Sequence, residues 1–164
     1  NNCISKELAE HISAKYPEIS KAWILTRQGG MFLGEGERNA IPAYDLYVRY
    51  LAARDVLPEP SHTISLPRIN EASFAALVMN RAMEPEIPNG ATIIVREIRA
   101  AQIVPGYQYV VVTDNISVLR TVKKGKGEDR LRLTASNPEF DEIEIDICEI
   151  RRLYVGRGHI YYNK

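Results

Sequence analysis

Residues 91–122 read ATIIVREIRAAQIVPGYQYVVVTDNISVLRTV, and this stretch decides the fold class. It holds three short runs of β-branched and aromatic residues, at 91–98, 107–113 and 116–122, which are separated by turn residues such as Gly106. Runs of this length, bounded by glycine, proline, asparagine or aspartate, are typical of β-strands. The stretch therefore predicts consecutive strands with tight connections.

The same pattern extends on both sides of this stretch, from residue 61 to residue 164. Further runs of the same kind are HTISL (62–66), SFAALVMN (73–80), RLRLT (130–134), EIEIDI (142–147) and RRLYVGRGHIYY (151–162). Helical periodicity does not intervene between these runs, so we expect a small, mainly β domain that is closed or strongly curled.

The N-terminal segment has a different pattern, which favours helices. Apolar residues recur every fourth position through ISKELAEHISAKY (residues 4–16), which predicts an amphipathic helix that Pro17 ends. Ser20 can cap a short second helix, and the pair Gly29-Gly30 can end it by supplying a positive φ.

Between these two patterns we place a linker at residues 35–60. The prolines Pro58 and Pro60 at its end disfavour continued regular structure. Tyrosines recur every third residue between Tyr44 and Tyr50, so part of the linker can form a helical turn. The expected organisation is a helical segment at 1–34, the linker, and the β domain at 61–164.

Composition restricts the classes of function. Hydrophobic residues make up 45% of the 164 residues and charged residues 26%, which is typical of a globular protein. Lys and Arg number 21, as do Asp and Glu, so bulk charge does not attract the chain to DNA or to anionic lipid.

Location and cofactors follow from what the sequence lacks. It has no apolar run of about 20 residues that would span a membrane and no secretory signal pattern. Cys3 and Cys148 lack metal-ligand spacing, which indicates unpaired thiols in a reducing cytosol. We expect a cytoplasmic protein without membrane contact, metal or cofactor. Because the sequence begins Asn-Asn-Cys and not with Met, we also expect a fragment or a processed product.

A more specific pattern lies at residues 78–90, VMNRAMEPEIPNG. It resembles the V-x-G-D-S-M-x-P-x-[IL]-x-x-G segment of the self-cleaving repressors, the family of LexA, UmuD and the repressors of lambda-like phages. Residues 131–140, LRLTASNPEF, are similar to the L-x-L-x-S-x-N-P-x-[YF] stretch of the same family. The resemblance covers residues 61–164, and several ordered matches are more specific than one short motif.

This resemblance implies a serine nucleophile and a lysine general base. The serine position is Ala82, which has no hydroxyl, and the lysine position is best matched by Arg120, whose guanidinium stays protonated. An alternative register would place Lys123 there, but Lys123 has the opposite strand parity. Asn80-Arg81 replaces the Gly-Asp pair that precedes the serine. The resemblance thus implies a degenerate site without catalytic residues.

The implied site consists of the degenerate positions and their neighbours. These are Asn80, Arg81, Ala82, Met83 and Arg120. In the family the substrate is the protein's own linker, cut at an Ala-Gly or Cys-Gly bond. The corresponding residues 47–54, YVRYLAAR, contain neither dipeptide, and Ala52-Ala53 is the nearest equivalent.

The N-terminal segment carries a resemblance of its own. Residues 15–31 are similar to the Y-P-x-[IL]-[NS]-x-x-W-[LI]-L-T-G-x-G-x-M ending of helix-turn-helix domains of the Xre and lambda-repressor type, although Thr26-Arg27 departs from the usual Thr-Gly. In that family the helix that reads the major groove lies upstream. The resemblance implies that DNA is a partner of the full-length protein, through N-terminal helices that are missing here.

Together these patterns favour a phage-repressor-like transcriptional regulator whose C-terminal domain forms homodimers and does not cleave itself. Residues 151–162 are the expected dimer contact, through Tyr154, Val155, Ile160 and Tyr161. Two alternatives remain open at this point. The chain could be a working self-cleaving serine-lysine peptidase, or a ligand-binding module in which Arg81 and Arg120 bind an anion in the vacated cleft.

Overall fold

The computed structural model describes residues 4–26, 31–32, 40–66, 69 and 71–162. The chain divides into two compact units. One unit comprises residues 1–40 with 64–69, and the other comprises residues 41–63 with 70–164.

The first unit contains the two predicted N-terminal helices, which form at Lys6–Lys15 (α1) and Lys21–Thr26 (α2). Each begins at a serine whose hydroxyl accepts a hydrogen bond from the backbone N–H three residues later. The N···O distance is 3.3 Å both at Ser5 and at Ser20. Gly29 and Gly30, which we expected to end the second helix, lie outside the described residues.

The expected apolar stripe of α1 is only partly covered. Leu8 is 51% exposed, whereas Ala9 in α1 and Ile24 in α2 are buried. Each of these two short helices covers only one side of the other. Part of the apolar stripe of α1 therefore stays exposed.

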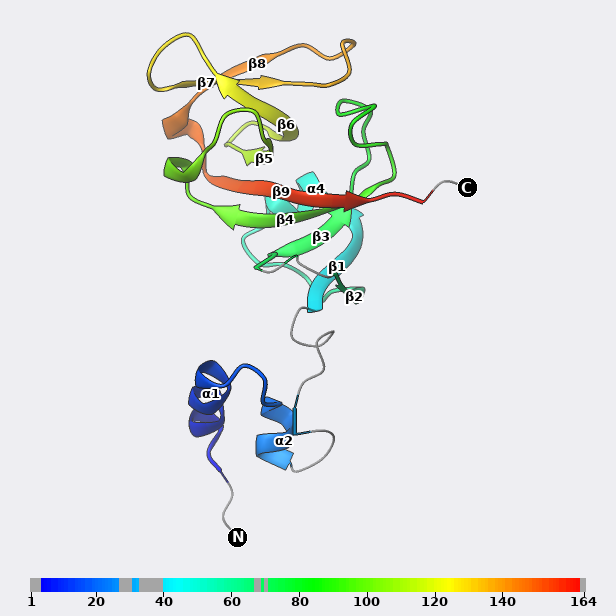
Figure 1. The fold of residues 1–164 in the computed structure, drawn as a ribbon. Helices are drawn as coiled ribbons and strands as arrows, with labels where there is room; N and C mark the ends of the chain where they lie inside the picture. Colours follow the sequence, from blue (N-terminus) through cyan, green and yellow to red (C-terminus); the bar gives the residue numbers. More distant parts are fainter. Residues whose placement is uncertain (1–3, 27–30, 33–39, 67–68, 70, 163–164) are drawn as a thin grey trace. The chain divides into compact units, whose positions relative to one another are not determined.

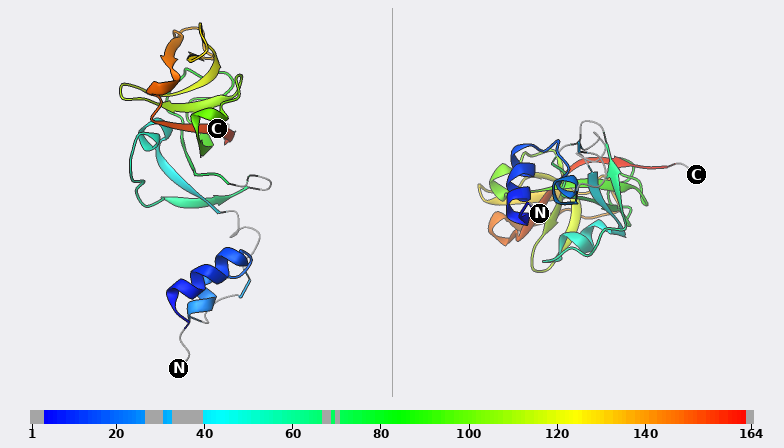
Figure 2. Two further views of the ribbon diagram at one scale, coloured as in Figure 1. Left: turned by 90° about the vertical axis from the view of Figure 1, so that its left-hand side faces the viewer. Right: turned by 90° about the horizontal axis from the view of Figure 1, so that it is seen from below.

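The second unit holds almost all of a nine-stranded sheet, which confirms the mainly β fold class (Figure 1). In spatial order its strands are β2 (His62–Ser65), β1 (Ala40–Tyr47), β3 (Phe74–Leu77), β4 (Thr92–Ile98), β9 (Arg152–Ile160), β5 (Gln108–Val112), β6 (Ser117–Lys124), β7 (Arg130–Thr134) and β8 (Ile143–Asp146). Strands β1 and β3 are parallel, and the pairs from β3 through to β8 are antiparallel. The figures show β7 and β8 at one end of this sheet and β1 at the other (Figures 1 and 2).

Two buried clusters form the core, on opposite faces of the central strands. Along β5, Tyr109 and Val111 belong to one cluster, while Val110 and Val112 belong to the other. This alternation follows from the two-residue period of a strand. We call the cluster with Val110 the first core cluster and the one with Tyr109 the second.

Residues 40–52 differ from the linker that we expected over 35–60. They form β1 and a short helix, Val48–Ala52 (α4), and the first core cluster includes Tyr44 and Leu51. The ring of Tyr44 packs edge-on against Phe74, with ring centroids 6.1 Å apart. The two later prolines correctly mark an interruption of regular structure, but the pairing of β1 with β3 is long-range and left no local periodicity to detect.

The structure also bears on three features that the sequence analysis considered: membrane-spanning helices, the cysteines and metal-ligand clusters. The described part of the chain has no helix long and apolar enough to cross a membrane. Cys148 is exposed and free, whereas Cys3 lies outside the described residues. Where side chains are described, His, Cys, Asp and Glu do not gather in threes as a metal site would require.

Candidate functional site

The 78–90 motif forms the turn that connects β3 to β4. Its ends are joined by two backbone hydrogen bonds, from the Val78 N–H to the Ala91 carbonyl at 2.8 Å and from the Gly90 N–H to the Val78 carbonyl at 2.7 Å. Gly90 has φ of +88°, a conformation that favours glycine, and this explains the glycine that closes the motif. The antiparallel pairing of the two strands therefore fixes where the turn begins and ends.

Ala82, which the family resemblance aligns with the serine, is fully buried in this turn. Its relative exposure is 0%, and the next residue, Met83, is part of the first core cluster. The Ala82 N–H donates to Oδ1 of Asn80 at 3.1 Å, so the Asn80 side chain helps to hold the turn. The methyl group of Ala82 offers neither a nucleophile nor a hydrogen bond.

Arg81 has an exposed side chain that is committed to a neighbour in the same turn. Its Nε donates to Oε2 of Glu84 at 2.9 Å. This bond, with the opposite charge, raises the pKa of Arg81, and the same bond lowers the pKa of the Glu84 carboxyl. Glu84 also accepts from the Asn89 N–H at 3.3 Å. Arg81 is therefore part of a surface ion pair.

Arg120, at the position that matches the family lysine, lies in β6 and is only 7% exposed. Its Nη1 donates to the Leu119 carbonyl at 2.9 Å, and its guanidinium lies 5.7 Å from the ring centroid of Phe140. Within the part of the chain that the structure describes, the buried Nε has no hydrogen-bond partner. Burial lowers the pKa of Arg120 from its ordinary value, because the charged form is poorly solvated.

The strand register around Arg120 agrees with the parity argument. Val118 and Val122, which share its face, contact the second core cluster, whereas Leu119 belongs to the first. Lys123, the alternative base, is exposed. Of the two candidates for the lysine position, Arg120 is therefore the one that lies inside the fold.

A short segment after β7 links the Ala82 turn to Arg120. The Asn137 N–H donates to the Ala82 carbonyl at 3.0 Å, and Asn137 Nδ2 donates to the Arg81 carbonyl at 3.1 Å. The Phe140 N–H donates to the Asn137 carbonyl at 3.2 Å, and the Phe140 ring lies against Arg120. Two motifs that are more than 40 positions apart in the sequence therefore meet at one place.

Asn137 and Phe140 are residues of this site to which the sequence analysis gave no role. Asn137 is buried, and its Oδ1 accepts from the Glu139 N–H at 3.0 Å. The signal was the Ser-Asn-Pro-x-Phe pattern, in which an asparagine before a proline is typical of a side-chain-stabilised turn. The pattern does not show which second segment the turn contacts.

Residues 47–54, where the family resemblance places the scissile bond, are folded into the domain. Leu51 and Ala52 of α4 are fully buried. The Ser117 hydroxyl donates to the Arg49 carbonyl at 2.6 Å, which ties the helix to the start of β6. Peptidases bind their substrates as extended strands, and this segment is helical and packed.

The C-terminal end of this segment is held by Arg152 at the start of β9. One guanidinium nitrogen of Arg152 contacts the Arg54 carbonyl, and Nη2 lies 2.6 Å from Oδ1 of Asp55. Segment 47–55 is thereby attached at both ends to strands of the same domain.

Comparison with protein families gives one match, and comparison with curated proteins gives no significant match. The family model is described as Peptidase S24-like and matches residues 40–155. The match begins at Ala40, so the family domain includes β1 and α4, which we had assigned to a linker. It also spans the Ala82 turn, Arg120 and the Asn137 segment, over more than half of the chain, and we conclude that the chain belongs to the Peptidase S24-like family.

Proposed function

We propose that this chain is part of a phage-repressor-like transcriptional regulator whose S24-like domain does not cleave itself. The domain serves to associate two protomers, and DNA is bound through a helix-turn-helix head to which α1 and α2 contribute. The family match supports the general class. The head is supported by the sequence pattern at residues 15–31 and by the two serine-capped helices.

The proposal that the chain does not cleave itself rests mainly on the two residues at the dyad positions. Ala82 is a buried methyl group, and Arg120 is a buried guanidinium that stays protonated at physiological pH. Self-cleavage needs a nucleophile and a neutral base together. In addition, the segment that would be cut is folded into α4, with Val48, Leu51 and Ala52 buried.

Prolonged incubation at alkaline pH, followed by intact-mass measurement, tests this proposal. A working member of the family would gain activity as its lysine loses a proton, whereas we expect this chain to keep its intact mass at about pH 10. The single variants Ala82→Ser and Arg120→Lys should also stay intact, since each restores only one partner. Cleavage of the unaltered chain between residues 44 and 56 would show instead that the peptidase alternative is right.

The homodimer is proposed to form along the C-terminal half of β9. Residues 152–160 pair with β4, but the pairing of β9 with β5 ends at Val155. On the side facing β5, residues 156–160 therefore lack the backbone pairing that covers residues 152–155. Tyr161 and Tyr162, which follow, are 47% and 82% exposed, whereas Tyr154, which we expected at the contact, is buried in the first core cluster. An open edge beside exposed aromatic residues is suited to a symmetric contact with a second copy.

Sedimentation equilibrium at increasing protein concentration tests the dimer. We expect a monomer–dimer equilibrium in the unaltered chain and a dissociation constant at least about tenfold larger in the double variant Tyr161→Asp/Tyr162→Asp. Tyr50→Asp changes a similarly exposed tyrosine on α4 and should leave the equilibrium unchanged. A chain that stays monomeric at high micromolar concentration would contradict the proposal.

A further inference from the structure

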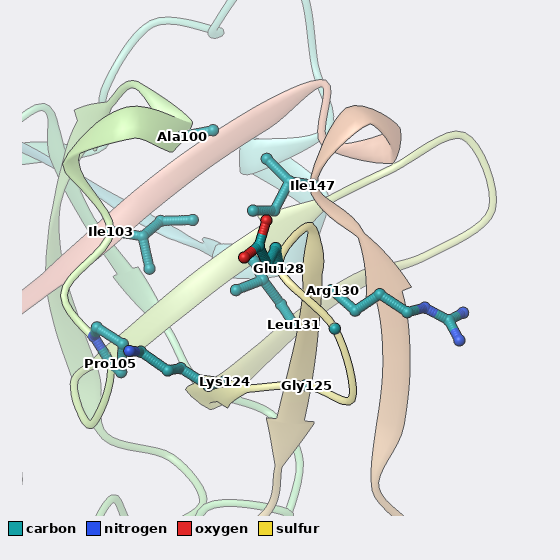
Figure 3. Close-up of a pocket in the computed structure, with 10 residues that line it drawn as sticks. Ala100, Ile103, Pro105, Lys124, Gly125, Glu128, Arg130, Leu131 and Ile147 are labelled. Carbon is teal, nitrogen blue, oxygen red and sulfur yellow. The ribbon is translucent and has the colours of Figure 1, made fainter.

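A pocket of about 540 Å³ lies at the end of the domain that carries β7 (Figure 3). Its walls are the 3₁₀ segment Ala100–Gln102 with the loop after it, the hairpin that joins β6 to β7, and the turn Ile147–Glu149 after β8. Its volume is within the range of about 300–1,000 Å³ that is usual for small-molecule sites. None of its lining residues belongs to the Ala82 turn, and Arg120 does not line it.

The inner surface of this pocket is apolar and continuous with the core. Leu131 is a buried member of the second core cluster, and Ile103 and Ile147 pack against that cluster. All three side chains border the cavity in Figure 3. An apolar group placed here would extend the second core cluster and remove apolar surface from water, which favours binding.

Backbone contacts hold the walls in place. The Gly125 N–H donates to the Arg130 carbonyl at 2.9 Å, and the Ile147 N–H donates to the Asp129 carbonyl at 2.9 Å. A Cβ atom at Gly125 would lie 2.8 Å from the Arg130 backbone, so only glycine allows the hairpin to close this tightly. The pocket is therefore formed before any ligand arrives.

Of the charged side chains at the pocket, Arg130 is already neutralised. Its guanidinium lies 3.0 Å from Asp146 and 3.6 Å from Glu144, and it points away from the cavity (Figure 3). Lys124 and Glu128 make no side-chain hydrogen bond or ion pair with the part of the chain that the structure describes. Both residues are exposed and line the pocket, and in the view of Figure 3 Lys124 extends toward the side of Pro105 and Glu128 toward the side of Ile147.

We propose that this pocket binds a small zwitterion with an apolar body, namely an apolar α-amino acid or a short apolar peptide. The ligand carboxylate binds the Lys124 ammonium, its ammonium binds the Glu128 carboxylate, and its side chain lies on the isoleucine and leucine surface. A ligand with one charge would form only one of these two charge-assisted hydrogen bonds, and an uncharged ligand would form neither.

Calorimetric or NMR titration of the whole chain tests the proposal with named probes. L-Leucine and the dipeptide Leu-Leu distinguish a free amino acid from a peptide as the ligand. N-acetyl-leucine lacks the ammonium, leucinamide lacks the carboxylate, and glycine lacks the apolar group. We expect leucine or the dipeptide to bind, and each probe that lacks one of these groups to bind at least about tenfold more weakly.

Two variants and two matched controls locate the site. Lys124→Gln and Glu128→Gln should each weaken binding about tenfold, whereas Lys126→Gln in the same hairpin and Glu59→Gln elsewhere should not change it. Three results would each overturn the proposal: no binding of either probe at about 10 mM to folded protein, equal binding of the acetylated probe, or affinity unchanged in both pocket variants. These measurements do not involve cleavage, dimerisation or DNA, so their failure is distinguishable from failure of the proposed function.

Discussion

At the scale of single residues, Arg120 carries the highest energetic cost in the site. It is a buried cation with one backbone hydrogen bond, one aromatic contact and an unpartnered Nε, and no carboxylate lies within ion-pair distance among the described residues. Desolvation of a buried charge costs several kcal/mol, which is more than these contacts return. The residue is thus tolerated by the fold and does not stabilise it.

From this balance we predict that Arg120→Met raises the free energy of unfolding by about 1 kcal/mol, because methionine fills similar space without a charge. Urea denaturation checks this, with Arg81→Met as the exposed control that should change stability by less than about 0.5 kcal/mol. A loss of stability in Arg120→Met would mean that the guanidinium has a stabilising partner.

Tyr154 gives a prediction for alkaline pH. It is buried in the first core cluster, and burial followed by the nearby Glu97 charge raises its pKa above the ordinary value near 10. A raised pKa in the folded state adds stability below the unfolded pKa, and this stability is lost as the pH rises through the folded pKa. We expect the free energy of unfolding to fall more steeply above about pH 10 in the unaltered chain than in Tyr154→Phe. Equal slopes in urea denaturation series would contradict this.

At the scale of elements, α4 holds the segment before β2 against the sheet. A five-residue helix is too short to form by itself, so its stability comes from packing Val48, Leu51 and Ala52 against the sheet. Ser117 and Arg152 add contacts at its two ends. One face of α4 is therefore part of the first core cluster.

We predict that Leu51→Ala destabilises the β domain by about 3 kcal/mol, because it leaves a cavity in the first core cluster. Tyr50→Ala, its exposed neighbour, should cost less than about 1 kcal/mol. Both values can be read from chemical denaturation followed by circular dichroism. A cost below about 1 kcal/mol for Leu51→Ala would show that α4 detaches from the sheet without consequence.

At the scale of the whole molecule, the chain consists of two compact units of unequal size. The helical unit buries Ala9 and Ile24 at its centre, whereas the β unit has two core clusters that extend over many strands. Two units with separate cores unfold as separate cooperative transitions when few contacts connect them.

Accordingly, we predict that Ile24→Ala lowers or abolishes a transition of the helical unit and leaves the midpoint of the β unit unchanged. Scanning calorimetry, with far-ultraviolet circular dichroism to follow helix content, checks this expectation. Leu133→Ala, in the second core cluster, should have the opposite effect. If both variants shift one common transition, the two units unfold cooperatively as one.

The sequence by itself determined the strands, because alternating β-branched runs between turn residues specify them locally. All eight strands that we expected from residue 61 onward form where they were predicted. It also determined the chemistry of Ala82 and Arg120, since a methyl group and a guanidinium keep their properties in any fold, and the face on which Arg120 lies, since strand parity is local.

Only the tertiary structure decided that residues 40–52 belong to the domain, because the parallel pairing of β1 with β3 joins positions that are about 30 residues apart. It likewise decided that Asn137 and Phe140 connect the Ala82 turn to Arg120, and that Arg120 is left without a carboxylate partner in the described part of the chain. Hydrogen bonds and burial between distant segments leave no periodic signal in a single sequence. Both features therefore depend on how the strands pack together and not on local preference.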